Sequence, residues 1–273
     1  MDNPELYSDN NKHRKPGVEE FINSYGGKLR NIHDGKEIAL LDIGSGCGRI
    51  LSEVFVGKSG LKFRKVIGID KSEEMVNISN EKYGNDLISF QLMDAEKEIP
   101  ENLKNLKFDL VTSFFSLPWN CDLNSAFQNV QTFLHPYGFL CCIILHVPKA
   151  IIQELKESKD DYVKHLIDFD NLPDSQLIDD PSKVIVQNLK NNRLEFATII
   201  DTEDDEFVFD DLEAVKNFFG TFFPNLSLLS ESEKSKLFEK LLTIFGMKVK
   251  DNKYAFGIRT ITFVARKSPD FLL

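Results

Sequence analysis

The sequence predicts an α/β fold in which a mostly parallel sheet carries helices on both of its faces. In the first half of the chain, short apolar runs alternate with stretches of helical spacing. The apolar runs are nearly continuous, which is typical of strands that are buried on both faces. A glycine-rich turn, Asp42-Ile-Gly-Ser-Gly-Cys-Gly48, joins the first run to the helical stretch that follows. Together these observations indicate parallel βαβ units.

Five strands and three helices are expected between residues 37 and 147. Ser72 has the character of a helix N-cap, and Gly84 ends the same helix. Pro136 and Gly138 are expected to end the third helix, because proline has no N–H group to continue it. The expected strands span 37–44, 65–70, 87–94, 107–117 and 139–147, and the expected helices span 47–57, 72–84 and 122–138.

After Pro148 the pattern is less regular, but a single domain over residues 1–273 is still expected, with no repeat or linker. The expected elements are helices at 149–169 and 182–192, a sixth strand at 193–201, helices at 211–222 and 231–246, and a final strand at 253–267. The domain then consists of an N-terminal helical arm (1–37), a cofactor-binding half (38–146) and a substrate-side half (147–273) with a helical insertion of about 202–250.

Composition and charge argue against several classes of protein. The chain has 33 basic and 43 acidic residues, and its net charge of −10 disfavours nucleic acid and anionic membrane surfaces. The longest apolar run, at 139–145, is too short to span a bilayer, and the N-terminus lacks the apolar segment of a signal peptide. Four cysteines without C-x-x-C spacing predict neither a zinc site nor disulfides. We therefore expect a cytoplasmic protein without metal, nucleic-acid or membrane partners.

The spacing of the glycines narrows the choice of ligand. At a strand-to-helix turn, glycine permits backbone angles and a close approach that a β-carbon forbids. A nicotinamide fingerprint is G-x-G-x-x-G and a phosphate-binding loop is G-x-x-x-x-G-K-[ST], and neither is present here. A cofactor with an amino-acid end presents an ammonium group, which Asp42 can attract directly or through water. The motif is D-x-G-x-G-x-G and consists of Asp42, Gly44, Gly46 and Gly48.

Two further carboxylates end the next two strands. Asp70 follows Gly48 by 22 residues, where an acid can accept hydrogen bonds from both hydroxyl groups of a ribose. Asp94 ends the third strand, where its carboxylate or the neighbouring backbone can meet an adenine amino group. A single glycine is more often a turn, and a single strand-end aspartate is more often a helix cap. Their occurrence at the ends of three successive strands favours a nucleoside site.

In this region the chain resembles the class I S-adenosylmethionine-dependent methyltransferases. The stretches "LLDIGSGCGRIL", "VIGIDKSEEMV", "FQLMDAEKEIP", "FDLVTSFFSLPW" and "LHPYGFL" are similar to five motifs of that class, in the same order. The resemblance implies a Rossmann-like fold with a seven-stranded, mostly parallel sheet, a helical cap, and S-adenosyl-L-methionine as the cofactor. It also places four more residues in the cofactor site: Lys71, Met75, Ala95 and Ser113.

A looser resemblance spans nearly the whole chain and is to the juvenile hormone acid O-methyltransferases of arthropods. It is carried by "ELYSDNNKHRK", by "FSLPW" and by the tail "FVFDDLEAVKNFF…FP…YAFGIRTITFVARK". It implies methylation of the carboxyl group of a small hydrophobic acid, such as farnesoic acid or juvenile hormone acid. Two positions depart from the family. Arg14 stands where the family has a glutamine that helps to hold the substrate carboxylate, and Pro118 stands where it has a histidine.

Arg14 and Trp119 are the candidate catalytic residues. Arg14 can orient the carboxylate of the acid through its N–H donors, and the open alternative is an exposed arginine on the N-terminal arm. Trp119 follows the fourth strand and can either wall an apolar pocket or fill core. Phenylalanines are expected to line the pocket or to form a lid over it, the lid being "NFFGTFFP". They are Phe114, Phe115, Phe218, Phe219, Phe222 and Phe223.

A carboxylate acceptor is consistent with the absence of a nucleophile–base pair, because a carboxylate is ionised at pH 7 and needs no base. Three alternatives stay open. One is N- or O-methylation of another small molecule, and another is a relative that binds the cofactor without catalysis. The third is a nicotinamide dehydrogenase, which needs a different glycine spacing. The sequence leaves the oligomeric state and the exact acid open.

Overall fold

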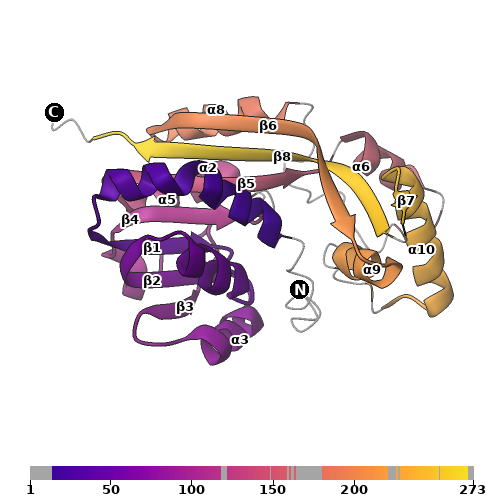
Figure 1. The fold of residues 1–273 in the computed structure, drawn as a ribbon, viewed down its shortest axis with the longest axis horizontal. Coiled ribbons are helices and arrows are strands. Elements are labelled where there is room, and N and C mark those ends of the chain that lie inside the picture. Colours follow the sequence, from indigo (N-terminus) through magenta and orange to yellow (C-terminus); the bar gives the residue numbers. More distant parts are fainter. Residues whose placement is uncertain are drawn as a thin grey trace.

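The computed structural model describes residues 14–117, 122–147, 149–158, 160, 163, 180–220, 226, 228–251 and 253–269. The strands of this part are β1 (Glu37–Ile43), β2 (Lys62–Asp70), β3 (Ile88–Leu92), β4 (Phe108–Phe114), β5 (Leu134–His146), β6 (Leu194–Phe209), β7 (Lys248–Lys250) and β8 (Lys253–Lys267). They form one sheet in the order β3-β2-β1-β4-β5-β8-β6, and β7 pairs with β8 (Figure 1).

The sheet is parallel over its first five strands and antiparallel beyond them. β1 pairs in parallel with β2 and β4, and β3 and β5 continue the parallel order on either side. β8 runs antiparallel to both β5 and β6. The carboxyl ends of β1, β2 and β4 therefore meet at one edge of the sheet, which is where open α/β sheets bind their ligands. The expected mostly parallel α/β sheet is confirmed.

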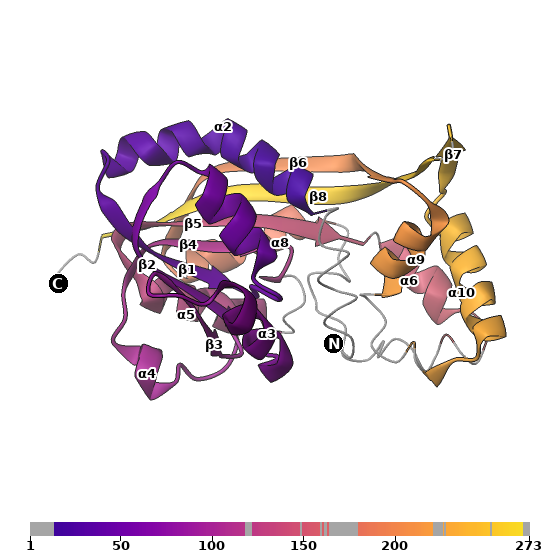
Figure 2. The same cartoon turned by 60° about the horizontal axis from the view of Figure 1, so that its bottom comes forward.

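Helices cover both faces of the sheet, as the apolar strands require. On one face α2 and η2, a helix of π type, pack with Leu40 and Leu110, and Figure 2 shows α2 lying along this face. On the other face α5 and α8 pack with Leu41 and Val111. The helices are α2 (Lys15–His33), η2 (Ile50–Val56), α3 (Glu73–Tyr83), α4 (Glu101–Lys104), α5 (Leu123–Phe133), α6 (Lys149–Lys156), α8 (Pro181–Asn191), α9 (Leu212–Gly220) and α10 (Glu231–Ile244).

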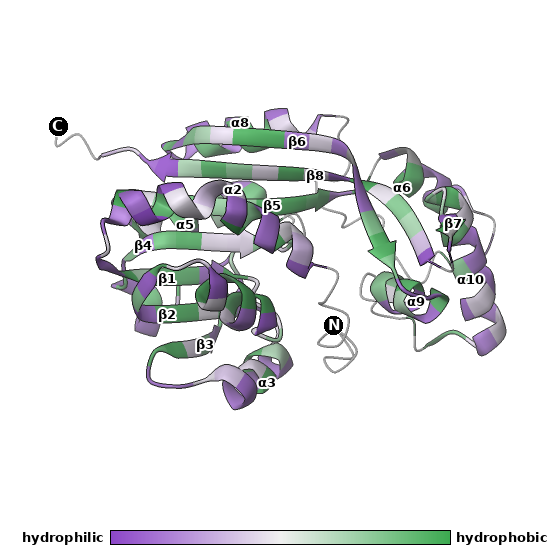
Figure 3. Ribbon diagram, viewed as in Figure 1, coloured by the Kyte–Doolittle hydropathy of each residue, from purple (hydrophilic) through white to green (hydrophobic). Residues whose placement is uncertain are grey.

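Several helices begin at residues whose side chains satisfy the first free N–H groups. The Ser72 hydroxyl accepts the Met75 N–H at the start of α3, as the sequence predicts. Asp122 caps α5 in the same way, and Ser230 and Glu233 form a reciprocal capping box at α10. These local signals fix where the helices start, whereas their apolar faces, green in Figure 3, fix which side meets the sheet.

Beyond the carboxyl ends of β4 and β5, the long strands β6 and β8 carry a second lobe (Figure 1). It contains α6, α9, α10 and β7, and its interior is a stack of phenylalanine rings. The rings of Phe209 and Phe256 are 5.5 Å apart and nearly parallel, and the Phe219 ring lies 5.5 Å from that of Phe256. Phe218 and Phe219 are therefore core residues of this lobe, since each is 2% exposed. Phe222 and Phe223 of the expected lid lie outside the described residues.

Two expectations about the second half are wrong. The described sheet has eight strands instead of seven, because three residues at β7 pair with the start of β8. The expected strand at 193–201 continues to Phe209, so the insertion does not begin at about residue 202. The acidic stretch Thr202-Glu-Asp-Asp-Glu206 has the composition of a loop, yet β8 supplies hydrogen-bond partners along it, with a register shift between Thr202 and Asp205. An edge strand tolerates such charges because one side of it faces water.

The third helix is also shorter than its sequence suggests. α5 ends at Phe133, and β5 begins at Leu134 instead of residue 139. Pro136 lies within the first residues of β5, where a missing N–H group costs little. No helix in the described ranges is both long and apolar enough to cross a membrane.

Candidate functional site

The glycine-rich turn at the end of β1 contains three glycines with left-handed backbone angles and is hydrogen-bonded to the end of β2. Gly44, Gly46 and Gly48 have φ angles of +69°, +54° and +78°. A β-carbon at Gly44 would lie 1.6 Å from the Ser116 hydroxyl oxygen, and one at Gly48 would lie 2.7 Å from the Phe90 ring. The Gly44 and Ser45 N–H groups both donate to the Ile69 carbonyl, at 2.8 and 3.0 Å. The turn therefore needs glycine both for its backbone angles and for its space.

The N–H groups of this turn are largely used within the protein. Besides the two bonds to Ile69, Gly46 N–H donates to Asp70 and Gly48 N–H donates to the Ser45 carbonyl. The turn therefore lets a ligand lie close to its backbone. It does not present the group of free N–H donors that a phosphate requires. This arrangement suits a nucleoside without a phosphate group.

Asp42 is a buried carboxylate beside the turn. Its side chain accepts the Thr112 hydroxyl at 2.6 Å, and the residue is 4% exposed. Burial raises the pKa of Asp42 to about 7, the Thr112 hydrogen bond opposes this shift, and the nearby Asp70 carboxylate adds to it. A cation beside Asp42 would favour the ionised carboxylate. This buried position therefore favours a positively charged ligand.

Asp70 is held rigidly at the end of β2. One carboxylate oxygen accepts the Gly46 N–H and the other accepts the Ser72 N–H, both at 2.9 Å. Burial raises the pKa of Asp70, and these two backbone hydrogen bonds act against that shift. Each oxygen retains a further lone pair, so the carboxylate can still accept the hydroxyl groups of a ribose. The structure thus brings Asp42, Asp70 and the glycine turn together, as the sequence predicts.

The turn after β3 contains Asp94 and Ala95. Asp94 accepts the Glu96 N–H through its side chain and the Lys97 N–H through its carbonyl. The Ala95 carbonyl accepts the Asn129 side-chain amide at 2.8 Å, which ties the turn to α5. This turn follows β3 at the same edge of the sheet as Asp70, since β2 and β3 are parallel neighbours.

Other predicted cofactor residues have different surroundings. Lys71 is exposed next to Asp70, whereas Met75 is 1% exposed and lies in the interior. The Ser113 hydroxyl donates to the Ile43 carbonyl at 3.1 Å and links β4 to β1. Its direct role in the structure is therefore to hold the two strand ends together. Pro118 and Trp119 lie outside the described residues.

Arg14 is buried, at 7% exposure, and immediately precedes α2. The Gly17 backbone of this helix lies against the Phe115 ring at the end of β4, because a β-carbon at Gly17 would be 3.2 Å from that ring. The start of α2 is therefore at the same edge of the sheet as the glycine turn. The alternative of an exposed arginine does not hold.

Sequence reasoning did not single out Ser116 or His146. Ser116 lies directly on Gly44, and His146 is the last residue of β5 and is 3% exposed. The only signal for either was position at a strand end, which does not distinguish a site residue from a core residue. No group of three or more His, Cys, Asp or Glu side chains in the described part of the chain could hold a metal ion.

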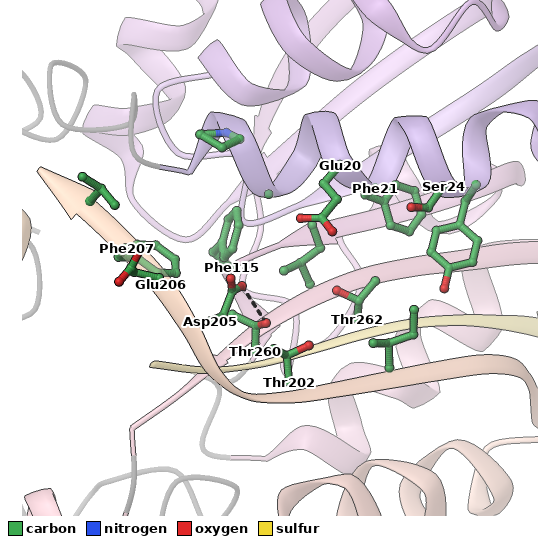
Figure 4. A pocket seen from close by; sticks show the side chains of 16 residues that line it. Glu20, Phe21, Ser24, Phe115, Thr202, Asp205, Glu206, Phe207, Thr260 and Thr262 are labelled. Atoms are coloured by element: carbon green, nitrogen blue, oxygen red, sulfur yellow. Dashed lines mark hydrogen bonds between the residues drawn. The ribbon is translucent and has the colours of Figure 1, made fainter. Parts of the chain in front are cut away.

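A cavity of about 440 Å³ lies between α2 and the strands β5, β8 and β6 (Figure 4). We call it the α2–β6 cavity. Phe21 and Phe115 give it apolar walls, and carboxylates and hydroxyl groups line the rest. The lining residues include Glu20, Phe21, Ser24, Phe115, Ile143, Thr202, Asp205, Glu206, Thr260 and Thr262.

Comparison with known proteins shows which protein family the chain belongs to. The family described as "Methyltransferase domain" matches residues 34–198, which is more than half of the chain, and the chain belongs to this family. A methyltransferase of Bacillus halodurans has the same fold, with a TM-score of 0.56 at 17% identity over 90% of this chain and 99% of that one. The protein is a class I S-adenosylmethionine-dependent methyltransferase, with S-adenosylmethionine as its cofactor.

More particular similarity is to two insect enzymes. The chain is 24% identical to the juvenile hormone acid O-methyltransferase of Drosophila melanogaster, over all of this chain and 94% of that protein. It is 29% identical to the juvenile hormone acid O-methyltransferase of Bombyx mori, over 54% of this chain and 52% of that protein.

We expect Gly44→Ala to weaken S-adenosylmethionine binding more than tenfold, because a β-carbon forces Ser116 away and strains the turn. Isothermal titration calorimetry would measure the affinity. Gly35→Ala is a matched control, since Gly35 has a φ of +67° but nothing within 4 Å of a β-carbon. It should retain affinity within about twofold. Equal losses in the two variants would contradict a specific role for the turn.

Asp42 should make stability depend on pH in a defined direction. In the folded protein its pKa is about 7, whereas in the unfolded chain it is about 3.9. Between these values the folded state binds the extra proton, so its stability falls as pH rises. The unfolding free energy of the wild type relative to Asp42→Asn should fall from about pH 4 to about pH 7 and then level off. Urea denaturation at several pH values would measure it, and a constant difference would contradict the buried-acid assignment.

Proposed function

We propose that this protein transfers the methyl group of S-adenosylmethionine to the carboxylate of a small hydrophobic acid, such as farnesoic acid or juvenile hormone acid. The observation that carries the proposal is the similarity over the whole chain to an insect enzyme named for juvenile hormone acid. The second, shorter similarity is to an enzyme of the same name.

In this proposal the buried carboxylates hold the cofactor. Asp42 holds the ammonium group of its amino-acid end, and ionisation of Asp42 becomes favourable when that charge is present. Asp70 accepts the ribose hydroxyl groups through its remaining lone pairs. The turn at Asp94 and Ala95 is proposed to bind the adenine amino group. Lys71, Met75 and Ser113 support these contacts from their neighbouring positions.

The chemistry required of the chain is positioning. When bound, S-adenosylmethionine supplies an activated methyl group on a positively charged sulfur. The acceptor carboxylate is ionised at neutral pH, so no residue has to remove a proton from it. The residues at the ends of β1 and β4 then have two tasks. They align the acceptor oxygen with the methyl group at near-attack distance, and they exclude water from the site.

Arg14 orients the acceptor in this scheme. Its burial at the start of α2, next to the end of β4, is consistent with a charge that serves the crevice and not the outer surface. A guanidinium group can bind a carboxylate through paired N–H donors, but a tight pair withdraws electron density from the attacking oxygen. We therefore infer that Arg14 binds one carboxylate oxygen and leaves the other free to react. Trp119 is proposed to wall the apolar part of the pocket.

A second candidate, methylation of an amine, is favoured by one observation. Glu20, Asp205 and Glu206 line the α2–β6 cavity, and none of the described lining residues is Lys, Arg or His. Such a wall attracts a cation and repels an acid. This candidate requires the acceptor to reach that cavity.

Incubation with labelled S-adenosylmethionine and a panel of acceptors would test the proposal. The panel contains isoprenoid acids, straight-chain fatty acids, and amines and alcohols of the same chain lengths. We expect label in the methyl esters of the hydrophobic acids. Label confined to the amines would replace the first candidate by the second, and label in none of the acids would refute the carboxylate assignment.

Arg14→Ala should lower kcat/KM for the acid about ten- to hundredfold, mainly through KM, because a hydrogen bond to a charged group is lost. Arg14→Lys keeps the charge, so its kcat/KM should lie between those of Arg14→Ala and the wild type. Lys15→Ala is the control, since Lys15 is exposed and forms an ion pair with Glu19 at 3.9 Å. Steady-state kinetics would measure kcat and KM for each variant, and calorimetry would measure its affinity for the cofactor. An Arg14→Ala enzyme with wild-type kinetics would exclude the proposed role.

A further inference from the structure

Phe115 lies where the end of β4 meets the cofactor turn. It is the first residue after β4, and the next residue, Ser116, is the one against which Gly44 is packed. Ser113, two residues earlier, is bonded to the end of β1. A methyl acceptor has to approach the cofactor near this junction, because it is the point at which β4 reaches the turn. Phe115 is therefore within the region that shapes the acceptor site.

The backbone of Phe115 is unusual for an aromatic residue. Its φ angle is +64°, which is unfavourable for a residue with a bulky side chain. Successive residues of a strand normally point to opposite faces, yet Phe114 and Phe115 both belong to the core on the α2 face. The left-handed angle thus returns the Phe115 ring to this face. The N–H of Phe115 donates to the Ile143 carbonyl at 2.7 Å, which holds the turn in place.

The ring of Phe115 forms one wall of the α2–β6 cavity. Figure 4 shows it between α2, which carries Glu20, and the Asp205–Thr260 hydrogen bond on the strands below. The ring packs closely against α2, because a β-carbon at Gly17 would lie 3.2 Å from it. The residue is 7% exposed. Phe115 therefore adjoins the cofactor turn through Ser116, and its ring lines a cavity large enough for a small ligand.

We propose that Phe115 is a specificity-determining residue whose ring separates the acceptor position from the α2–β6 cavity and thereby limits the length of the acceptor. The inference rests on methyl transfer at the proposed site, but it does not depend on whether the acceptor group is a carboxylate. Removing the ring joins the cavity to the acceptor position. Longer acceptors then gain space that the wild type denies them.

The test compares Phe115→Ala with the wild type on straight-chain acids from octanoic to octadecanoic acid. The ratio of kcat/KM for the longest to the shortest acid should rise at least tenfold in the variant, whereas cofactor affinity should stay within about twofold. Phe115→Gly should behave alike and folds more readily, because glycine adopts the left-handed angle without strain. Phe115→Ala with Ile143→Phe refills part of the cavity and should restore the wild-type preference.

Phe114→Ala is the matched control. The Phe114 ring belongs to the same core and packs on Phe21 and Phe55, but it does not line the cavity. This variant should lose stability and keep the wild-type length preference. A Phe115 variant with an unchanged preference, or a Phe114 variant with an equal shift, would overturn the proposal.

Amines and alcohols of the same lengths separate this inference from the carboxylate assignment. If only amines are methylated, the headgroup assignment fails, and the length dependence still decides the role of Phe115. If the wild type methylates none of the probes, calorimetric binding of the same series with S-adenosylhomocysteine present supplies the length profile. A profile that is the same for Phe115→Ala and the wild type would again overturn the proposal.

Discussion

The left-handed turn at the end of β1 is the constraint on which the site depends. Its backbone bonds to the Ile69 carbonyl and to the Asp70 carboxylate, so the ends of β1 and β2 are fixed to each other. Ser116 fills the space that a side chain at Gly44 would need, so the end of β4 is fixed to the same turn. Three strand ends therefore share one junction, and the proposed contacts of Asp42 and Asp70 to the cofactor extend from it.

Charge at this junction is arranged for a cationic ligand. Asp42 is buried, and burial raises its pKa to about 7 even though the Thr112 hydroxyl donates a hydrogen bond to it. Asp70 is stabilised by two backbone N–H groups but also has a raised pKa. Two carboxylates so close together repel each other when ionised. A positively charged ligand would relieve this repulsion, so these two carboxylates favour a cation over a phosphate group.

The second lobe reaches the carboxyl edge of the sheet without a linker. β6 and β8 pair over nearly their whole lengths, and their far ends support α9, α10 and the phenylalanine stack. The hydrogen bonds between β6 and β8 make the lobe continuous with the sheet. The lengths of β6 and β8 therefore set how far the lobe extends beyond β4 and β5. The shared wall at Phe115 links the cavity beside α2 to the same edge. The proposed acceptor selection thus involves the cavity between α2 and the strands, whereas the proposed cofactor site lies at the edge of the sheet.

The sequence alone determined the parallel sheet, the glycine turn and the carboxylates at the ends of β1, β2 and β3, because hydrophobic period and glycine spacing are local properties. It did not predict the length of β6, since acidic residues have the composition of a loop until β8 is seen to pair with them. It named Phe115 as one of six phenylalanines that could line a pocket, but it did not distinguish this residue from the other five. Its left-handed angle and its place as a cavity wall arise only when α2, β4 and β5 come together, because those contacts join residues far apart in the chain.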